Sequence, residues 1–146
     1  MYNYRAGTVW DSGRAGRIQG DDRLAIRVGT PQEFGGPAGV WSPEQLLVAA
    51  VDSCLMSTFL FFAERSGIKV HSYGSTTAGR MDKTPEGLRF TAMDVNIAVV
   101  VDENTDVDKA RRLQSKLEKY CPVSTSLRCP VILYLKVAVR EDHKDG

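Results

Sequence analysis

SPEQLLVAAVDSCLMSTFLFFAERSG, residues 42–67, is the one long apolar stretch of the chain and predicts a single long helix. Ser42 is a good N-cap, Pro43 suits the first helical position, and Glu44 places a carboxylate near the positive end of the helix dipole. Gly67 is a natural stop. Because apolar residues occupy almost every side of this helix, we expect a central core helix surrounded by protein.

The polar residues of this helix mark a candidate site. Cys54 lies in its middle, and the two carboxylates Glu44 and Asp52 share the helix with it. Ionisable groups are costly to bury and need partners, so together they indicate a site more strongly than an isolated cysteine does. The alternative is that the cysteines are inert core residues, since free cysteine is among the most buried residue types.

Size and composition narrow the possible functions. A chain of 146 residues predicts one domain spanning 1–146, and a net charge of +1 with scattered basic residues argues against nucleic acid binding. The N-terminus lacks the apolar core of a signal peptide, and Glu44 and Asp52 argue against a membrane span, so we expect a cytoplasmic protein without a membrane partner. Three cysteines without a CxxC motif or a nearby histidine argue against a zinc site and leave redox chemistry or plain packing as their role; we expect no cofactor.

The flanking segments predict a mixed α+β chain. Strands at 2–10 and 23–28 predict a β-meander, and the glycine-rich segment 30–41 is either a connector or a lid. After the central helix we expect two strands, 68–80 and 88–101, joined by a turn at 84–87, and a last strand at 131–139.

A second helix is expected between the hairpin and the last strand. It begins near Thr105, where Thr105 and Asp108 have capping-box spacing, and it ends at Cys121 before Pro122. Its apolar face consists of Val107, Ala110, Leu113, Leu117 and Tyr120. Its charged face, expected to be solvated, consists of Asp106, Lys109, Arg112, Lys116 and Lys119.

The sequence around the cysteines resembles the OsmC/Ohr family of osmotically inducible and organic hydroperoxide resistance proteins. The resemblance rests on Pro43–Leu46, on Cys54 ten positions after Glu44, and on the Cys-Pro-x-Ser motif Cys121–Ser124, and it covers nearly the whole chain. It implies an α+β, OsmC-like fold, with antiparallel β-sheets packed around a long central buried helix in an intertwined homodimer.

The resemblance also implies a chemistry, that of a Cys-based peroxidase acting in oxidative or osmotic stress defence. Cys54 would attack an organic hydroperoxide and become a sulfenic acid, which would condense with the resolving Cys121 to a disulfide. An external dithiol, lipoyl-type in the Ohr branch, would reduce the disulfide. Arg14, in the turn after the first strand, would stabilise the Cys54 thiolate, with Arg17 as the alternative, and Glu44 would orient the arginine.

Helix geometry bears on this assignment. Cys54 follows Glu44 by ten residues, which is about 15 Å along a straight helix. Either the helix breaks between them, or Arg14 and Glu44 serve a cysteine of a second chain. The second alternative predicts a homodimer, as does a helix that is apolar on every side.

Several alternatives stay open at the level of sequence. Asp52 could raise the pKa of Cys54 unless it points away, and Cys129 is either a buried small hydrophobe or a competing resolving thiol. An apolar substrate pocket, or simply the core, would be formed by Phe34, Trp41, Met56 and Phe59. The competing functions are an OsmC-like small-ligand-binding or redox-sensing protein without efficient peroxidase activity, and a partner-binding protein with inert cysteines.

Overall fold

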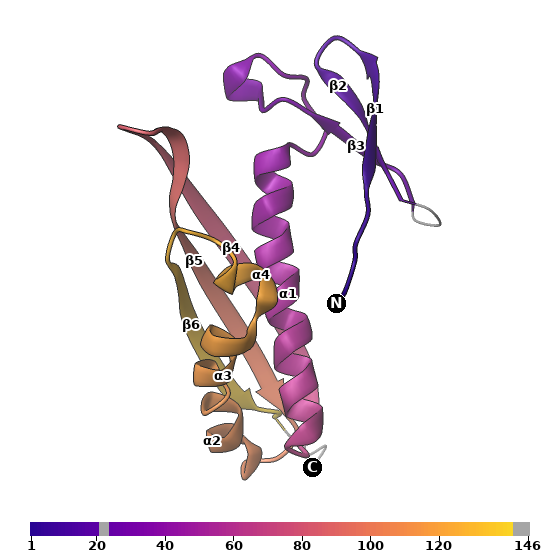
Figure 1. Cartoon of the computed structure of the whole chain (residues 1–146). Helices are drawn as coiled ribbons and strands as arrows, with labels where there is room; N and C mark the ends of the chain where they lie inside the picture. Colours follow the sequence, from indigo (N-terminus) through magenta and orange to yellow (C-terminus); the bar gives the residue numbers. More distant parts are fainter. Residues whose placement is uncertain (21–23, 142–146) are drawn as a thin grey trace. The chain divides into compact units, whose positions relative to one another are not determined.

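The computed structural model describes residues 1–20 and 24–141, and the chain divides into two compact units, Met1–Leu47 and Val48–Gly146 (Figure 1). In the described residues each unit carries a three-stranded sheet. The long helix α1, Pro43–Arg65, begins in the first unit and continues into the second. The α+β class is confirmed, whereas a single domain spanning both units stays a prediction.

The first unit is built on an antiparallel meander of β1 (Gly7–Ser12), β2 (Ala15–Gln19) and β3 (Ile26–Gly29). The expected meander is present, and its middle strand β2 lies between the two expected strands, where AGRIQ shows no alternation of apolar residues. The expected strand at 2–10 begins five residues later, at Gly7, and residue 23 of the expected strand 23–28 lies outside the described residues. The following loop contains one short 3₁₀ turn, η1 (Gln32–Phe34).

Both ends of α1 have the predicted chemistry. Ser42 Oγ accepts a hydrogen bond from the Gln45 N–H at 3.1 Å, and Gln45 Oε1 accepts one from the Ser42 N–H at 3.2 Å. These two bonds form a capping box. At the other end Gly67 has φ +69°, its N–H bonds to Glu64 O, and the next N–H bonds to Ala63 O, which is a Schellman motif.

Within the second unit, the residues that the structure describes cover one face of α1. Its fully buried residues recur every fourth position and are Val51, Leu55, Phe59 and Ala63. On the other faces Met56, Leu60 and Phe61 are between 38% and 50% exposed. Coverage of α1 on every side therefore stays a prediction. By its length and composition alone, α1 could also cross a membrane. The core helix of a soluble protein can have the same length and composition.

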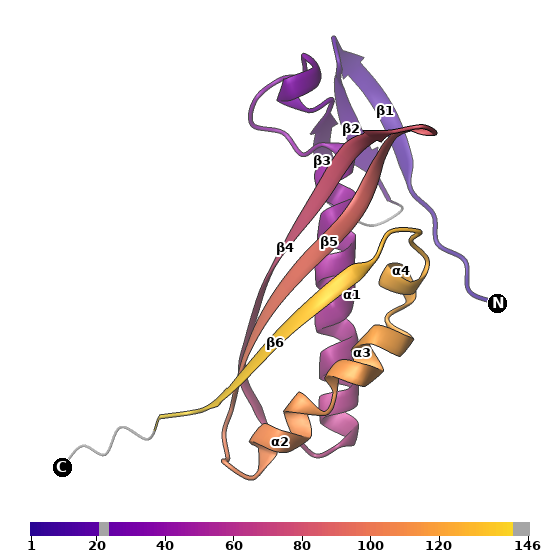
Figure 2. The ribbon, with the colours of Figure 1, turned by 90° about the vertical axis from the view of Figure 1, so that its left-hand side faces the viewer.

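The second unit contains the sheet β4 (Val70–Thr84), β5 (Gly87–Val101) and β6 (Val131–Val139), in that order. The hairpin of β4 and β5 and the position of β6 agree with the predictions. However, β6 runs parallel to β5, so this sheet is mixed rather than wholly antiparallel. The reason is the helical connection between them, because a crossover of this kind returns the chain in the same direction. Figure 2 shows the helices gathered on one face of this sheet.

The expected second helix is divided into α2 (Asp106–Arg111), α3 (Gln114–Tyr120) and α4 (Pro122–Thr125). The predicted capping box is wrong, because the Thr105 side chain caps nothing. Asp106 is also not on a solvated face: it is 5% exposed, and its Oδ2 accepts the backbone N–H of Lys69 at 3.3 Å. This carboxylate therefore ties the start of α2 to the residue that precedes β4.

Candidate functional site

Two thiols that are 67 residues apart in sequence meet in the second unit. Cys121 donates an S–H hydrogen bond to Cys54, with the two Sγ atoms 3.2 Å apart, and both cysteines are free thiols. Cys54 comes from the middle of α1, whereas Cys121 lies between α3 and α4. A disulfide requires an S–S separation of about 2.0 Å, so a small side-chain movement would join them.

The backbone around Cys121 holds its sulfur in place. Because Pro122 disfavours a helical conformation in the residue before it, Cys121 is extended, with φ −71° and ψ 110°, and α3 ends there. Its N–H bonds to Leu117 O at 3.2 Å, and its carbonyl accepts the N–H and the Oγ1–H of Thr125 at 3.1 and 2.7 Å. The side chain is 0% exposed. The Cys-Pro step thus turns the chain and presents a fixed thiol to α1.

The surroundings of Cys54 act on its ionisation in opposing ways. Burial raises the pKa of the Cys54 thiol, and the neighbouring Cys121 raises it further. The backbone N–H of Val123 and the hydroxyl of Thr58 act in the opposite direction, because they favour the thiolate. Burial is the largest of these influences, so the residues of the second unit alone favour the neutral thiol.

Asp52 is engaged by a partner on the sheet. Its Oδ1 accepts the Thr77 Oγ1–H at 2.7 Å, and Asp52 is not among the groups that shift the pKa of Cys54. The structure therefore answers the question left open by the sequence: the carboxylate points toward β4 rather than at the thiol.

A row of hydroxyl side chains on β4 packs against the face of α1 that carries Asp52 and Phe59. Tyr73, Ser75 and Thr77 alternate along the strand and are partly buried, so they share one face. The Tyr73 ring packs on Phe59 with the centroids 5.5 Å apart, and its hydroxyl oxygen is shielded from solvent, with the Ser75 hydroxyl as a polar neighbour. Burial raises the pKa of Tyr73 to about 12, while the nearby Ser75 hydroxyl lowers it in part.

These β4 residues were not identified as part of a site from the sequence. The sequence does contain a signal for them: Tyr73, Ser75 and Thr77 are spaced two residues apart on a strand, so their side chains share one face. On a strand that follows an apolar helix, such a face lies either toward solvent or toward that helix.

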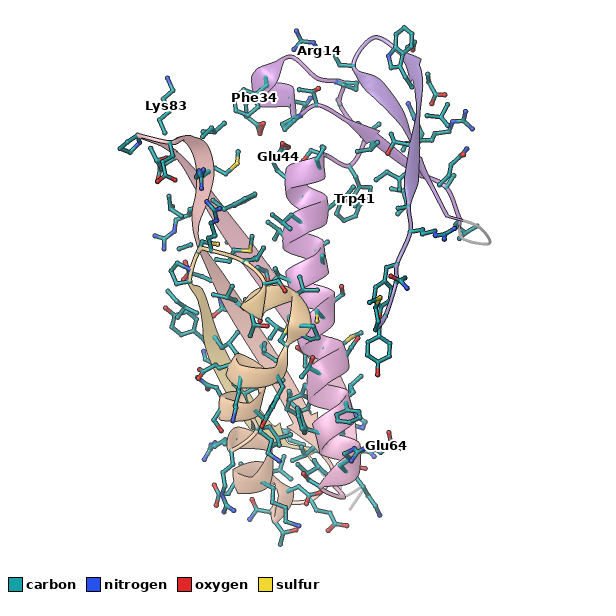
Figure 3. The ribbon with its side chains drawn as sticks, viewed as in Figure 1. Arg14, Phe34, Trp41, Glu44, Glu64 and Lys83 are labelled. Carbon is teal, nitrogen blue, oxygen red and sulfur yellow. The ribbon has the colours of Figure 1, made fainter. Side chains whose placement is uncertain are left out.

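Arg14 and Arg17 belong to the first unit and have different partners. Arg14 lies in the β1–β2 turn, where its Nη1 donates to the Phe34 carbonyl of η1 (Figure 3). The side chain lies against Gly35, where a Cβ would be 3.1 Å from Nη1. Arg17 is paired with Asp11, with its Nε 3.1 Å from both carboxylate oxygens. Of the two, Arg17 has its charge already matched by a carboxylate.

Glu44 lies in the first turn of α1, where Figure 3 labels it. Its Oε2 is shielded from solvent and has no hydrogen-bond partner among the described residues, and no ion pair joins it to Arg14. A buried carboxylate oxygen without a partner is costly and is ready to accept a donor. Moreover, α1 is unbroken from Pro43 to Arg65, so the alternative of a helix break between Glu44 and Cys54 is wrong.

The residues considered for a substrate pocket differ in burial. Phe59 is fully buried and belongs to the core, whereas Phe34, Trp41 and Met56 are 49%, 49% and 38% exposed. Cys129 is partly buried and precedes β6. Within residues 1–20 and 24–141, no group of three or more His, Cys, Asp or Glu side chains is placed to hold a metal ion.

The structure is that of an α+β protein with a mixed three-stranded sheet and a long apolar helix. Two adjacent free thiols, one of them on that helix, mark it as a candidate thiol-dependent protein. The sequence matches the family described as OsmC-like protein over residues 36–136. The chain therefore belongs to the OsmC-like protein family, as the resemblance of its motifs implied.

Known relatives agree with this family. The uncharacterized protein YmaD of Bacillus subtilis is 25% identical over 120 residues, which is 80% of each chain. The organic hydroperoxide resistance protein-like 1 of Staphylococcus saprophyticus is 25% identical over 138 residues, 94% of this chain and 96% of that protein. The solved structure of an OsmC-like protein of unknown function from Vibrio cholerae has a TM-score of 0.81 at 20% identity and covers 93% of this chain and 100% of its own.

Proposed function

We propose that this protein is a thiol-dependent peroxidase that reduces organic hydroperoxides, with Cys54 as the peroxidatic and Cys121 as the resolving cysteine. The observation that carries the proposal is the 3.2 Å separation of the two sulfur atoms. A sulfenic acid is protected from further oxidation only if a second thiol lies close enough to trap it. Relatives named for organic hydroperoxide resistance support the choice of substrate.

The cycle has three balanced steps. The Cys54 thiolate attacks the distal oxygen of ROOH, the O–O bond breaks, and the alkoxide leaves and is protonated to ROH. The Cys121 thiol then attacks the sulfenic acid, which forms the disulfide and releases water. An external dithiol reduces the disulfide and is itself oxidised to a cyclic disulfide; the family resemblance makes a lipoyl-type dithiol the candidate.

Arg14 and Glu44 are proposed as the groups that activate the thiol. Since burial raises the pKa of Cys54, a fixed positive charge is needed to favour the thiolate at neutral pH. Arg14 is exposed and its guanidinium has no carboxylate partner among the described residues, whereas Arg17 is paired with Asp11. The unpartnered Oε2 of Glu44 is a suitable acceptor to orient that guanidinium.

A homodimer is part of the proposal. Because α1 is continuous, Glu44 and Cys54 are separated by about 15 Å along one helix, so Arg14 and Glu44 would serve the cysteine of a second chain. The exposed Met56, Leu60 and Phe61 of α1 are the apolar surface that such a dimer would cover. A solution mass near 16.1 kDa by light scattering would contradict this arrangement, and one near twice that mass is expected.

The test is peroxide-dependent disulfide formation. We expect one equivalent of cumene hydroperoxide to convert reduced protein to a Cys54–Cys121 disulfide, located by mass spectrometry, and to do so faster than an equivalent of hydrogen peroxide. Cys54→Ser should abolish peroxide consumption, whereas Cys129→Ser, the matched control, should leave it unchanged. Scattered oxidation that is equal in the Cys54→Ser variant would overturn the proposal and favour a ligand-binding or redox-sensing OsmC-like protein.

A second experiment addresses the arginine. Arg14→Lys keeps the charge but loses the bidentate geometry, and Arg14→Met removes both. We expect the rate of Cys54 oxidation to fall in both variants, by more in Arg14→Met, while Arg17→Met has a smaller effect. Equal rates in wild type and Arg14→Met would remove Arg14 from the proposed site. The cytoplasmic location expected from the sequence is part of the same proposal, because reduced thiols are the starting state of the cycle.

A further inference from the structure

Both backbone polar groups of Cys121 are held by hydrogen bonds. Its N–H donates to Leu117 O on α3 at 3.2 Å. Its carbonyl oxygen accepts the Thr125 Oγ1–H at 2.7 Å and the Thr125 N–H at 3.1 Å, with the Ser124 hydroxyl as a third donor at 3.3 Å. The two shortest of these bonds to the carbonyl come from one residue, Thr125. Cys121 is therefore anchored by the helix before it and by the turn after it.

The turn after Cys121 has few backbone hydrogen bonds with which to keep this arrangement. The helix α4 is four residues long, and Pro122 supplies no N–H. The Thr125 N–H makes the α-helical bond to the Cys121 carbonyl, whereas the next two N–H groups bond to carbonyls three residues back. A helical turn of this length is marginal by itself, because it fixes several residues for few bonds. The Thr125 hydroxyl adds a second bond to the carbonyl on which the turn depends.

The Thr125 hydroxyl has two acceptors within reach. Besides the Cys121 carbonyl at 2.7 Å, the Pro122 carbonyl lies 3.4 Å from Oγ1. A hydroxyl carries a single hydrogen, and hydrogen bonds between oxygen atoms are commonest near 2.7–2.8 Å. The shorter contact is therefore the effective one, and it ends on the cysteine.

Holding this carbonyl also holds the Cys121 side chain. The φ of −71° and ψ of 110° relate the side chain to the peptide groups on either side, and both groups are tied by the bonds described above. Cys54, in turn, belongs to the unbroken helix α1. The 3.2 Å separation of the two sulfur atoms thus depends on how firmly the Cys121 backbone is held.

We propose that the Thr125 hydroxyl is a positioning group for disulfide closure: by holding the Cys121 carbonyl, it keeps the Cys121 sulfur within reach of the Cys54 sulfur and raises the rate at which the two join. Thr125 acts through the backbone of Cys121 and not on a reacting atom. This inference rests on the proposed two-cysteine cycle and assigns a residue to its second step.

Disulfide closure can be followed without a peroxide. In a Cys129→Ser background, the thiolate of the partly exposed Cys54 attacks the disulfide of dithiobis(nitrobenzoate), and one thionitrobenzoate leaves. The Cys121 thiolate then attacks the Cys54 sulfur of the mixed disulfide, so that the Cys54–Cys121 bond forms and a second thionitrobenzoate leaves. A large excess of reagent makes the first release the faster phase, and stopped-flow absorbance gives the rate constant of each.

The variants differ in one hydrogen bond. Thr125→Val removes the hydroxyl but keeps the shape of the side chain, and Thr125→Ser keeps the hydroxyl. Because Thr125 is exposed, neither change disturbs the core. Ser126→Ala is the matched control: the Ser126 Oγ–H donates to Pro122 O at 2.6 Å, a bond of the same kind in the same turn, but its acceptor is not Cys121.

We expect the second release to slow about fivefold in Thr125→Val, as for the loss of one neutral hydrogen bond. It should stay within about twofold of the wild-type rate in Thr125→Ser and Ser126→Ala. The first release depends on Cys54 and should be unchanged in every variant, whereas a general loss of structure would alter both releases. Equal second releases in wild type and Thr125→Val overturn the inference. If Thr125→Val fails to fold, Thr125→Ala replaces it, with the same expected and contradictory results.

The outcome is separable from the proposed peroxidase activity, because the exchange needs no hydroperoxide. Slow hydroperoxide reduction by wild type, together with a slowed second release in Thr125→Val, would contradict the proposed activity and support the inference. Rapid hydroperoxide reduction with equal second releases would do the reverse. With hydroperoxide as the oxidant, dimedone competes with Cys121 for the sulfenic acid, and the ratio of dimedone adduct to disulfide should rise about fivefold in Thr125→Val. An unchanged ratio would likewise overturn the inference.

Discussion

Thr77 on β4 holds the carboxylate of Asp52 on α1 through a hydrogen bond of 2.7 Å, two residues before the cysteine that we propose as peroxidatic. A negative charge beside a thiol disfavours the thiolate, so the position of this carboxylate matters to the reactivity of Cys54. The hydroxyl of one β4 residue thus fixes an unfavourable charge away from the sulfur.

Thr77→Val should release this carboxylate. Valine keeps the shape of threonine but cannot donate, so the Asp52 charge is free to turn toward the sulfur and raise the pKa of Cys54. We expect alkylation of Cys54 by iodoacetamide at pH 7.5 to slow about threefold in a background lacking Cys121 and Cys129. Thr77→Ser, which keeps the hydroxyl, is the control. Equal alkylation rates for the valine and serine variants would contradict the prediction.

The ends of α1 were predictable from the sequence because each rests on a local signal. Ser42, three residues before Gln45, encodes the capping box, and Gly67 supplies the positive φ that the Schellman motif requires. The hairpin of β4 and β5 likewise follows from alternation and the turn at 84–87. These elements are determined by residues that are close together in the chain.

What could not be predicted depends on tertiary contacts. The division between α2 and α3 at Arg112 and Leu113 has no glycine or proline to mark it, and the parallel pairing of β6 follows from where the preceding helices pack. The adjacency of Cys54 and Cys121 came from a family resemblance, since no periodicity relates residues 67 positions apart.

The capping box of α1 should contribute measurably to stability. Ser42 is 6% exposed, and its hydroxyl accepts the Gln45 N–H. Ser42→Ala leaves that N–H without its partner and should lower the free energy of unfolding by about 1 kcal/mol. Urea denaturation of the reduced protein gives this value, with Ser42→Thr as the control that keeps the oxygen. A loss of the same size in both variants would show that the hydroxyl is not the cause.

Asp106 should prove to be a structural carboxylate rather than a surface charge. It is buried, accepts the Lys69 N–H at 3.3 Å and lies 3.8 Å from the Lys109 ammonium. Asp106→Ala leaves the N–H unsatisfied and should cost about 1–3 kcal/mol of unfolding free energy. Asp108→Ala, on the same helix but exposed and paired with Arg111, should cost less than about 0.5 kcal/mol. Similar losses in the two variants would contradict the assignment.

The raised pKa of Tyr73 makes a prediction about alkaline stability, and its sign can be worked out. The folded-state pKa of about 12 lies above the ordinary value of about 10, so folding favours the protonated phenol. The resulting stabilisation is fully present below pH 10 and is lost as the pH rises through 12, because the unfolded chain releases its proton first.

The Tyr73→Phe variant has no phenolic proton at position 73, so its free energy of unfolding should not show this part of the decline. We therefore expect the free energy of unfolding of wild type, relative to Tyr73→Phe, to be constant from pH 7 to 9 and to fall between pH 10 and 12. Tyr134→Phe should follow wild type throughout, because other alkaline titrations are common to both proteins. If wild type and Tyr73→Phe lose stability in parallel across pH 10–12, the hydroxyl is not held in its protonated form by the fold.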